Sequence, residues 1–122
     1  MPVTGPDFIS LQTRDLDASQ AFYEQYVGPV RSQAGPPNAV VFVSKTTAFA
    51  LREIVPGTDL ASTPQPGIGA AIWLHATDVQ AIHDALVADG QPIISAPIDG
   101  PFGRIFTFAD LDGYQITLHD RA

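Results

Sequence analysis

The chain contains an internal repeat, and this repeat constrains the fold more than any other feature of the sequence. When Asp15 is matched to Asp78, residues 8–28, FISLQTRDLDASQAFYEQYVG, align with residues 71–90, AIWLHATDVQAIHDALVADG, with one gap. In each copy the residues first alternate as in a strand, apolar residues then follow at helical spacing, and a glycine ends the copy. An aspartate at the change of period is typical of a helix N-cap. The repeat predicts the same strand–helix unit twice.

Strand-like segments follow each predicted helix. They are rich in β-branched and aromatic residues, which favour strands. They cover residues 38–44 and 47–55 in the first half, and 92–98, 103–109 and 113–120 in the second. We therefore predict an α+β fold of two βαβββ modules, with curved mixed sheets around a cleft and helices on the outer face. The modules, about residues 6–55 and 69–121, form a single domain (1–122) and are joined by a proline- and glycine-rich loop.

The composition excludes several classes of function. The 122 residues carry a net charge of −7 and only six Lys and Arg, too few cations for the phosphate contacts of a nucleic-acid-binding protein. An acidic field favours cationic or neutral ligands over anionic ones. No apolar run approaches the roughly 20 residues that span a membrane, and the N-terminus does not resemble a signal peptide. We expect a cytoplasmic protein that binds neither nucleic acid nor membranes.

The two faces of each predicted sheet differ in composition. One face is aliphatic and suits packing beneath the helices: Ile9 and Leu11, Ile72 and Leu74, Ile116 and Leu118. The other mixes aromatic, small and polar side chains: Phe8, Ser10 and Gln12; Phe49, Leu51 and Glu53; Ala71, Trp73 and His75; Ile105 and Thr107; Thr117 and His119. Such a mixture is what a small-molecule pocket needs. The alternative is that this face is exposed to solvent or forms a dimer contact.

Three motifs together resemble a known family. DLDASQAFYEQYVG, TDVQAIHDALVADG and FADLDGYQITL are similar to segments of the vicinal oxygen chelate superfamily, although Leu111 replaces a usual proline. That superfamily includes glyoxalase I, extradiol dioxygenases, fosfomycin-resistance enzymes and bleomycin-resistance proteins. The likeness covers nearly the whole chain. It implies paired βαβββ modules around a cleft, often completed in a homodimer.

The resemblance also implies where a metal ion would be held. In the enzymes of that superfamily, His, Glu or Gln side chains on the first and last strands of each module bind a divalent metal. Those positions fall here on Phe8, Ala71 and Thr117, and near Leu51. Phe, Ala and Leu offer no donor atom, and a neutral hydroxyl is a poor ligand for such an ion. The sequence therefore predicts a protein without a metal cofactor.

An alternative is a metal site displaced along the same strands. Gln12, Glu53, His75 and His119 lie two or four residues beyond those positions and are suitable ligand types for one divalent metal ion. With such a site the protein would be a lyase, isomerase or dioxygenase. A metal-free reaction with His75 or His119 as general base is also open. The same side chains can equally orient a ligand by hydrogen bonds.

The function predicted from these features is metal-independent binding of a small molecule. The resemblance to bleomycin-resistance proteins implies sequestration of an aromatic or cationic compound such as an antibiotic, and an interaction module with a vestigial cleft is the remaining alternative. The predicted ligand-binding residues are Phe8, Ser10, Gln12, Phe49, Leu51, Glu53, Trp73, His75, Thr107, Thr117 and His119.

Overall fold

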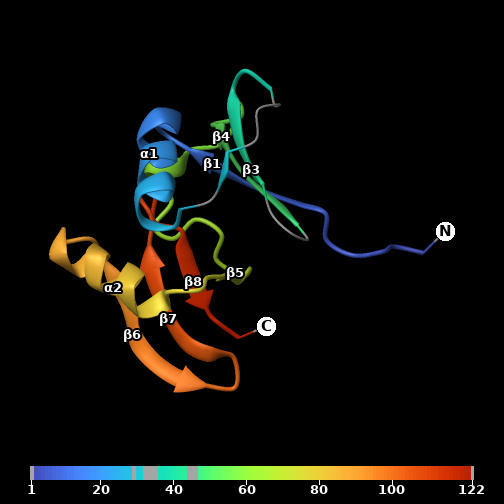
Figure 1. Ribbon diagram of the computed structural model, residues 1–122. Coiled ribbons are helices and arrows are strands. Elements are labelled where there is room, and N and C mark those ends of the chain that lie inside the picture. Colours follow the sequence, from blue (N-terminus) through green and yellow to red (C-terminus); the bar gives the residue numbers. More distant parts are fainter. Residues whose placement is uncertain (1, 29, 32–35, 44–46, 122) are drawn as a thin grey trace. The chain divides into compact units, whose positions relative to one another are not determined.

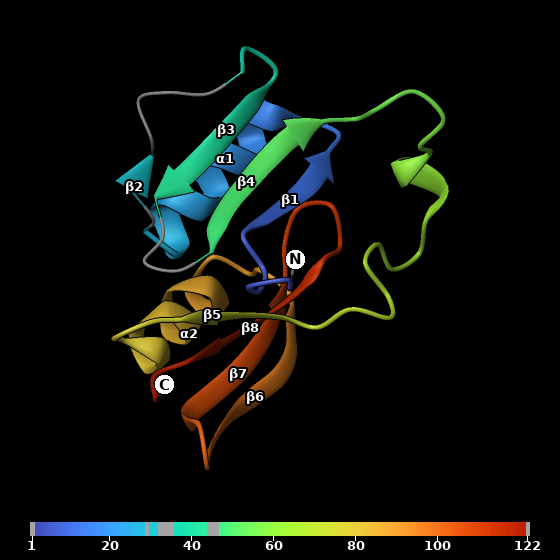
Figure 2. The same ribbon diagram turned by 90° about the vertical axis from the view of Figure 1, so that its right-hand side faces the viewer.

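The chain folds into two compact units in sequence order. The computed structural model describes residues 2–28, 30–31, 36–43 and 47–121, without the side chains of 30 and 31. It divides between Leu60 and Ala61, and we call the two units module 1 and module 2. Each contains a four-stranded sheet and an α-helix (Figures 1 and 2).

Module 1 is a mixed sheet with a helix inserted after its first strand. Its elements are β1 (Phe8–Thr13), α1 (Leu16–Tyr26), β2 (Val30–Arg31), β3 (Ala39–Val43) and β4 (Ala48–Glu53). The strand order is β1-β4-β3-β2, with β1 parallel to β4 and the other pairs antiparallel. The short β2 lies outside the strand segments predicted from sequence.

Module 2 repeats this topology. A short 3-10 helix, η1 (Leu60–Ser62), spans the boundary, followed by β5 (Ile72–His75), α2 (Val79–Ala88), β6 (Ile93–Gly100), β7 (Gly103–Ala109) and β8 (Gln115–His119). The order is β5-β8-β7-β6, again with the first and last strands parallel. The predicted α+β fold of two βαβββ modules is confirmed, whereas the single domain and the cleft stay predictions.

Helix α1 packs its aromatic side chains onto the sheet of module 1. The helix begins at Asp15, whose carboxylate accepts a hydrogen bond from the Ala18 backbone N–H at 3.1 Å. Tyr23 is fully buried, and its ring centroid lies 5.4 Å from that of Phe49. Burying a side chain of this size stabilises the fold by about 1.5–3 kcal/mol. This contact defines the helix side of the module 1 sheet.

Helix α2 covers one face of the module 2 sheet in the same way. Val79 and Leu86 are buried, and the His83 ring meets the Phe106 ring edge to face at 5.3 Å. Phe106 and Phe108 are almost completely buried, as are Ile116 and Leu118 of β8. The prediction that the two phenylalanines point toward the helix is confirmed.

The predicted face of β4 was wrong by one residue. Phe49 and Leu51 stand in register with Ile9 and Leu11 of β1, and registered residues on paired strands share a face. Both side chains are buried, and Phe49 contacts α1. Phe49, Leu51 and Glu53 therefore lie on the helix side, and Ala48, Ala50 and Arg52 share the face of Phe8, Ser10 and Gln12.

Neither helix of the described chain has the features of a membrane span. A span needs a length of about 20 residues and a largely apolar sequence, and none of the helices in the described residues meets both conditions.

Candidate functional site

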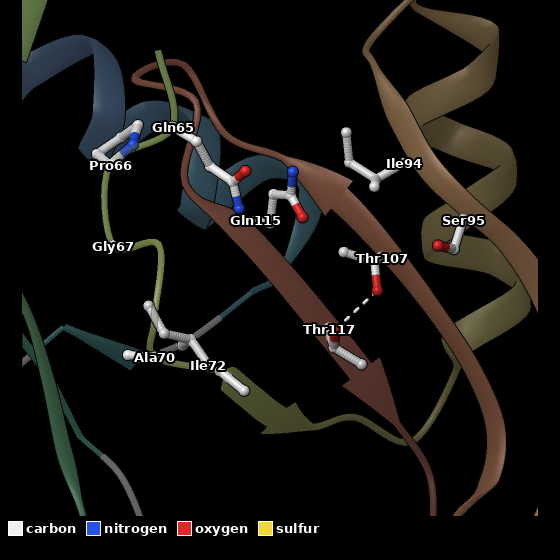
Figure 3. Close-up of a pocket in the computed structure, with 11 residues that line it drawn as sticks. Gln65, Pro66, Gly67, Ala70, Ile72, Ile94, Ser95, Thr107, Gln115 and Thr117 are labelled. Atoms are coloured by element: carbon white, nitrogen blue, oxygen red, sulfur yellow. Dashed lines mark hydrogen bonds between the residues drawn. The ribbon is translucent and has the colours of Figure 1, made fainter. Parts of the chain in front are cut away.

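A pocket of about 200 Å³ opens on the face of the module 2 sheet that is opposite α2. Its floor is formed by Thr107 of β7 and by Gln115 and Thr117 of β8, as Figure 3 shows. The other lining residues are Ile94 and Ser95 of β6, the loop residues Gln65, Pro66, Gly67 and Ala70, and Ala71 and Ile72 at the start of β5. The pocket is therefore built from four strands and one loop of a single module.

The loop wall is held in place by the turn between β7 and β8. Asp110 anchors this turn, because its carboxylate accepts hydrogen bonds from the backbone N–H groups of Asp112 at 3.0 Å and Tyr114 at 2.9 Å. The Tyr114 ring lies so close to Gly67 that a Cβ there would be 3.3 Å from it. The backbone of the loop thus packs directly on the turn, and this contact fixes one side of the pocket.

Two hydroxyl groups meet on the pocket floor. Thr107 and Thr117 are directly opposite one another on β7 and β8, and their Oγ1 atoms are 2.7 Å apart (Figure 3). In such a pair one hydroxyl donates and the other accepts, so one O–H group remains to donate to a third partner. The floor of the pocket therefore presents a neutral hydrogen-bonding group. The sequence-based prediction that Thr107 and Thr117 share this face is confirmed.

Four rings gather on the same face of the sheet. We call Trp73, His75, Phe102 and His119 the aromatic cluster. Trp73 meets Phe102 at 5.3 Å and His119 at 5.5 Å, and the two histidine rings are 5.8 Å apart. Trp73 is 43% exposed and Phe102 is 50% exposed, an unusual state for large apolar side chains. Because Trp73 is the register partner of Thr117, the aromatic cluster begins one strand away from the pocket floor.

The predicted site residues of module 1 do not form one set. Phe8 is 55% exposed, and Ser10 and Gln12 follow on the same face of β1. Gln12 already has a structural role, since its Oε1 accepts a hydrogen bond from the Val55 backbone N–H at 2.8 Å. Glu53 is exposed on the opposite face. A metal site that uses both Gln12 and Glu53 on one face is therefore wrong.

Comparison with family models gives one match over most of the sequence. Residues 5–118 match the model of the Glyoxalase/Bleomycin resistance protein/Dioxygenase superfamily. The chain belongs to this superfamily. Membership agrees with the paired βαβββ modules and confirms the resemblance that the three sequence motifs indicated.

Several solved structures share the fold over nearly the whole chain. TnmS3, an antibiotic binding protein from Streptomyces sp. CB03234, is 23% identical with a TM-score of 0.73, over 100% of this chain and 99% of that one. A glyoxalase/dioxygenase from Nostoc punctiforme is 19% identical with a TM-score of 0.75, over 98% and 92%. UcmS2 is 20% identical with a TM-score of 0.73, over 98% and 99%. No curated protein matches the sequence.

The superfamily's metal-binding positions do not fit a metal ion in this chain. Of the four positions that the resemblance implies, Ala71 and Thr117 line the pocket, Phe8 is on the exposed face of β1, and Leu51 is buried on the helix side. Only Thr117 carries an oxygen, and that oxygen is bonded to Thr107. Within the described residues, no group of three or more His, Cys, Asp or Glu side chains is placed to hold a metal. The pocket thus includes two of the four positions that the resemblance implies as metal ligands, and neither of the two carries a side chain suited to that role.

Several pocket residues were missed by the sequence analysis. Gln115 was predictable, because it lies two residues before Thr117 and alternation places both on one face. Gln65, Pro66 and Gly67 had no such signal, since the loop containing them read only as a linker between the modules. Phe102 was also missed, because it lies in the turn between β6 and β7 rather than on a strand.

Proposed function

We propose that this protein binds an aromatic small molecule without a metal ion and sequesters it rather than transforming it. The molecule would lie on the open face of the module 2 sheet, with its ring against the aromatic cluster. Sequestration requires affinity and a protein present in stoichiometric amounts, and it needs no group that stabilises a transition state. We propose an antibiotic as the kind of compound that is bound and the cytoplasm as the place of action.

One observation carries this proposal. The pocket occupies Ala71 and Thr117, the module 2 positions of the superfamily's metal ligands, and it is lined by neutral side chains next to exposed rings. Apolar area with a few fixed polar groups is the usual composition of a ligand site. A flat ring that covers exposed aromatic side chains stacks on them and removes apolar area from water, and both effects favour binding. The antibiotic-binding description of TnmS3, which shares the fold, supports the same function.

Tryptophan fluorescence tests the proposal directly, because Trp73 is the only tryptophan of the chain. Titration with a library of aromatic natural products should give saturable quenching at one ligand per chain, with Kd in the micromolar range or tighter. Mass spectrometry should recover each binder unchanged. Recovery of a converted product, or a complete absence of binders, would contradict sequestration.

Replacement of Trp73 separates a binding role from a role in the core. Trp73→Ala should abolish binding in equilibrium dialysis and leave the melting temperature nearly unchanged, since the side chain is 43% exposed. Val87→Ala is the matched control, because Val87 is 52% exposed on α2 and does not line the pocket. Unfolding of Trp73→Ala would show that the ring is structural.

Metal analysis tests whether the proposed binding is independent of a metal ion. Protein purified without chelators should contain less than stoichiometric zinc, nickel, iron and manganese, and added metal should not shift its melting temperature. Ligand binding should survive dialysis against EDTA. Nanomolar affinity for one of these ions, together with a metal-dependent melting shift, would favour an enzyme instead.

A further inference from the structure

Among the described residues, the wall of the pocket in module 2 contains no ionisable side chain. Its lining consists of two glutamines, two threonines, a serine and small or apolar residues. A charged group that enters such a pocket loses its water shell and finds no opposite charge to replace it. The net charge of −7 favours the approach of cations to the molecule as a whole, but no carboxylate in the pocket wall would hold one.

The neutral groups of the pocket are available to a ligand. Gln65 and Gln115 both line the pocket (Figure 3), and among the described residues neither side-chain amide has a hydrogen-bond partner. Each amide offers both an oxygen acceptor and N–H donors. The pair formed by Thr107 and Thr117 adds one O–H donor. The pocket is therefore suited to a group that both donates and accepts.

The size of the pocket limits what enters it. Sites that enclose a whole drug-sized ligand have volumes of about 300–1,000 Å³, and this pocket has about 200 Å³. Only the end of such a ligand fits, and the remainder must lie on the surface beside it. The aromatic cluster begins one strand away, because Trp73 and Thr117 are register partners on strands about 4.8 Å apart.

We propose that the ligand is uncharged and has two parts: a flat ring and a polar end that carries both a hydrogen-bond donor and an acceptor, such as a carboxamide. The polar end enters the pocket between Gln65, Gln115 and the threonine pair, and the ring lies against Trp73 and Phe102. This inference rests on the proposed binding function and narrows its ligand class to neutral molecules. It therefore excludes the cationic compounds that the sequence analysis includes among the predicted ligands.

Three matched probes test the charge of the ligand. 2-Naphthamide, 2-naphthoate and 2-naphthylmethylammonium share one ring system and differ in the charge of the attached group. By quenching of Trp73 fluorescence, 2-naphthamide should bind at least ten-fold more tightly than either ion at neutral pH. Its Kd should change less than two-fold between 50 and 500 mM NaCl, because no charge pair contributes.

Two variants test whether the pocket provides the selectivity. Gln115→Leu and Thr117→Val should each weaken 2-naphthamide binding at least five-fold and leave the weak binding of the two ions unchanged. Gln25→Leu is the control, because Gln25 is exposed on α1 in module 1. Circular dichroism of each variant verifies the fold, and Thr117→Val still tests the pocket if Gln115→Leu does not fold.

The outcomes separate this inference from the proposed function. Equal or tighter binding of either ion would overturn the neutral ligand and leave the binding function intact. If library compounds bind but none of the three probes does, the inference alone fails. If neither the probes nor any library compound binds, the proposed function fails as well.

Discussion

Gly103 links the aromatic cluster to the C-terminal residues of the described chain. It is the first residue of β7, directly after Phe102 of the β6–β7 turn, and it has a φ of +83°. The Arg104 N–H donates to the Asp120 carboxylate at 2.9 Å, and the Arg121 N–H donates to the Phe102 carbonyl at 3.0 Å. A Cβ on Gly103 would collide with the Asp120 carboxylate. The close contact of the Gly103 backbone with Asp120 and Arg121 therefore holds Phe102 in position.

We expect Gly103→Ala to lower the free energy of unfolding by about 1–3 kcal/mol, because the new methyl group displaces Asp120 at a strained backbone position. Urea unfolding measures the loss. Gly100→Ala is the control, since nothing lies within 4 Å of a Cβ there and its φ is not positive. That change should stay within about 0.5 kcal/mol. Equal losses of unfolding free energy for the two variants would show that the contact with Asp120 is not the cause.

Asp84 on α2 is an exposed carboxylate held by its neighbours. Its Oδ1 lies 2.9 Å from the His83 Nδ1 atom and accepts a hydrogen bond from Gln80 Nε2 at 2.9 Å. The hydrogen bond from His83, followed by that from Gln80, lowers the pKa of Asp84 below its usual value of 3.8. A lowered pKa in the folded state means that ionised Asp84 favours folding above its unfolded pKa, and this contribution is lost as the pH falls through the folded pKa.

An NMR titration of the carboxyl carbons should place the midpoint of Asp84 below 3.8 in the folded protein. His83→Ala should move this midpoint back up, because the largest cause of the shift is removed. If the Asp84 midpoint does not change when His83 is replaced, the hydrogen bond from His83 is not the cause of the lowered pKa.

The two helices begin differently although the repeat predicts the same N-cap for both. Asp15 accepts a hydrogen bond from the Ala18 N–H, whereas Asp78 occupies the N-cap position of α2 without a side-chain cap bond. We expect Asp15→Ala to lower the free energy of unfolding by about 1 kcal/mol, a typical value for a lost cap. Asp78→Ala should cost clearly less in the same urea titration. Similar losses at both positions would show that the cap bond contributes little.

The strands show how far the sequence predicts the elements. Both helices and seven strands lie where their periodicity indicated, because burial imposes periods of 3.6 and 2 on them. The face of β4 was misassigned, because the pairing of β4 with β1 sets it and this pairing is not visible in the β4 segment alone. The rule applied to β1, that large apolar residues pack beneath the helix, would have placed Phe49 and Leu51 correctly. The two-residue β2 is too short to show a period.

At the scale of the whole molecule, the repeat was sufficient to predict the architecture but not the site. Two βαβββ modules follow from one duplicated pattern, whereas the pocket depends on contacts between residues far apart in the sequence. Gln65 and Ile94 line the same pocket although 29 positions separate them. No local pattern predicts such a contact, so a loop wall is visible only in three dimensions.

We expect the protein to form a homodimer in solution, as the family resemblance implies. Phe8 on β1 is 55% exposed, and large exposed apolar side chains commonly mark an interface. Sedimentation velocity should show a species of twice 13.0 kDa. The species should persist in 1 M NaCl, because apolar contacts are not screened by salt. A mass of 13.0 kDa at every concentration would rule the dimer out.

The loop that precedes β5 in module 2 is also a wall of the pocket, and this limits how the length of the loop can vary. Residues 64–70 pack on the β7–β8 turn through Gly67 and Tyr114, so an insertion there would reshape the space that a ligand enters. Residues 56–59 lie between Val55, whose N–H is bonded to Gln12, and that contact, so we expect added length there to leave the wall intact. In fusions or circularly permuted chains, the insertion or the new termini should therefore be placed before residue 60 and not within residues 64–70.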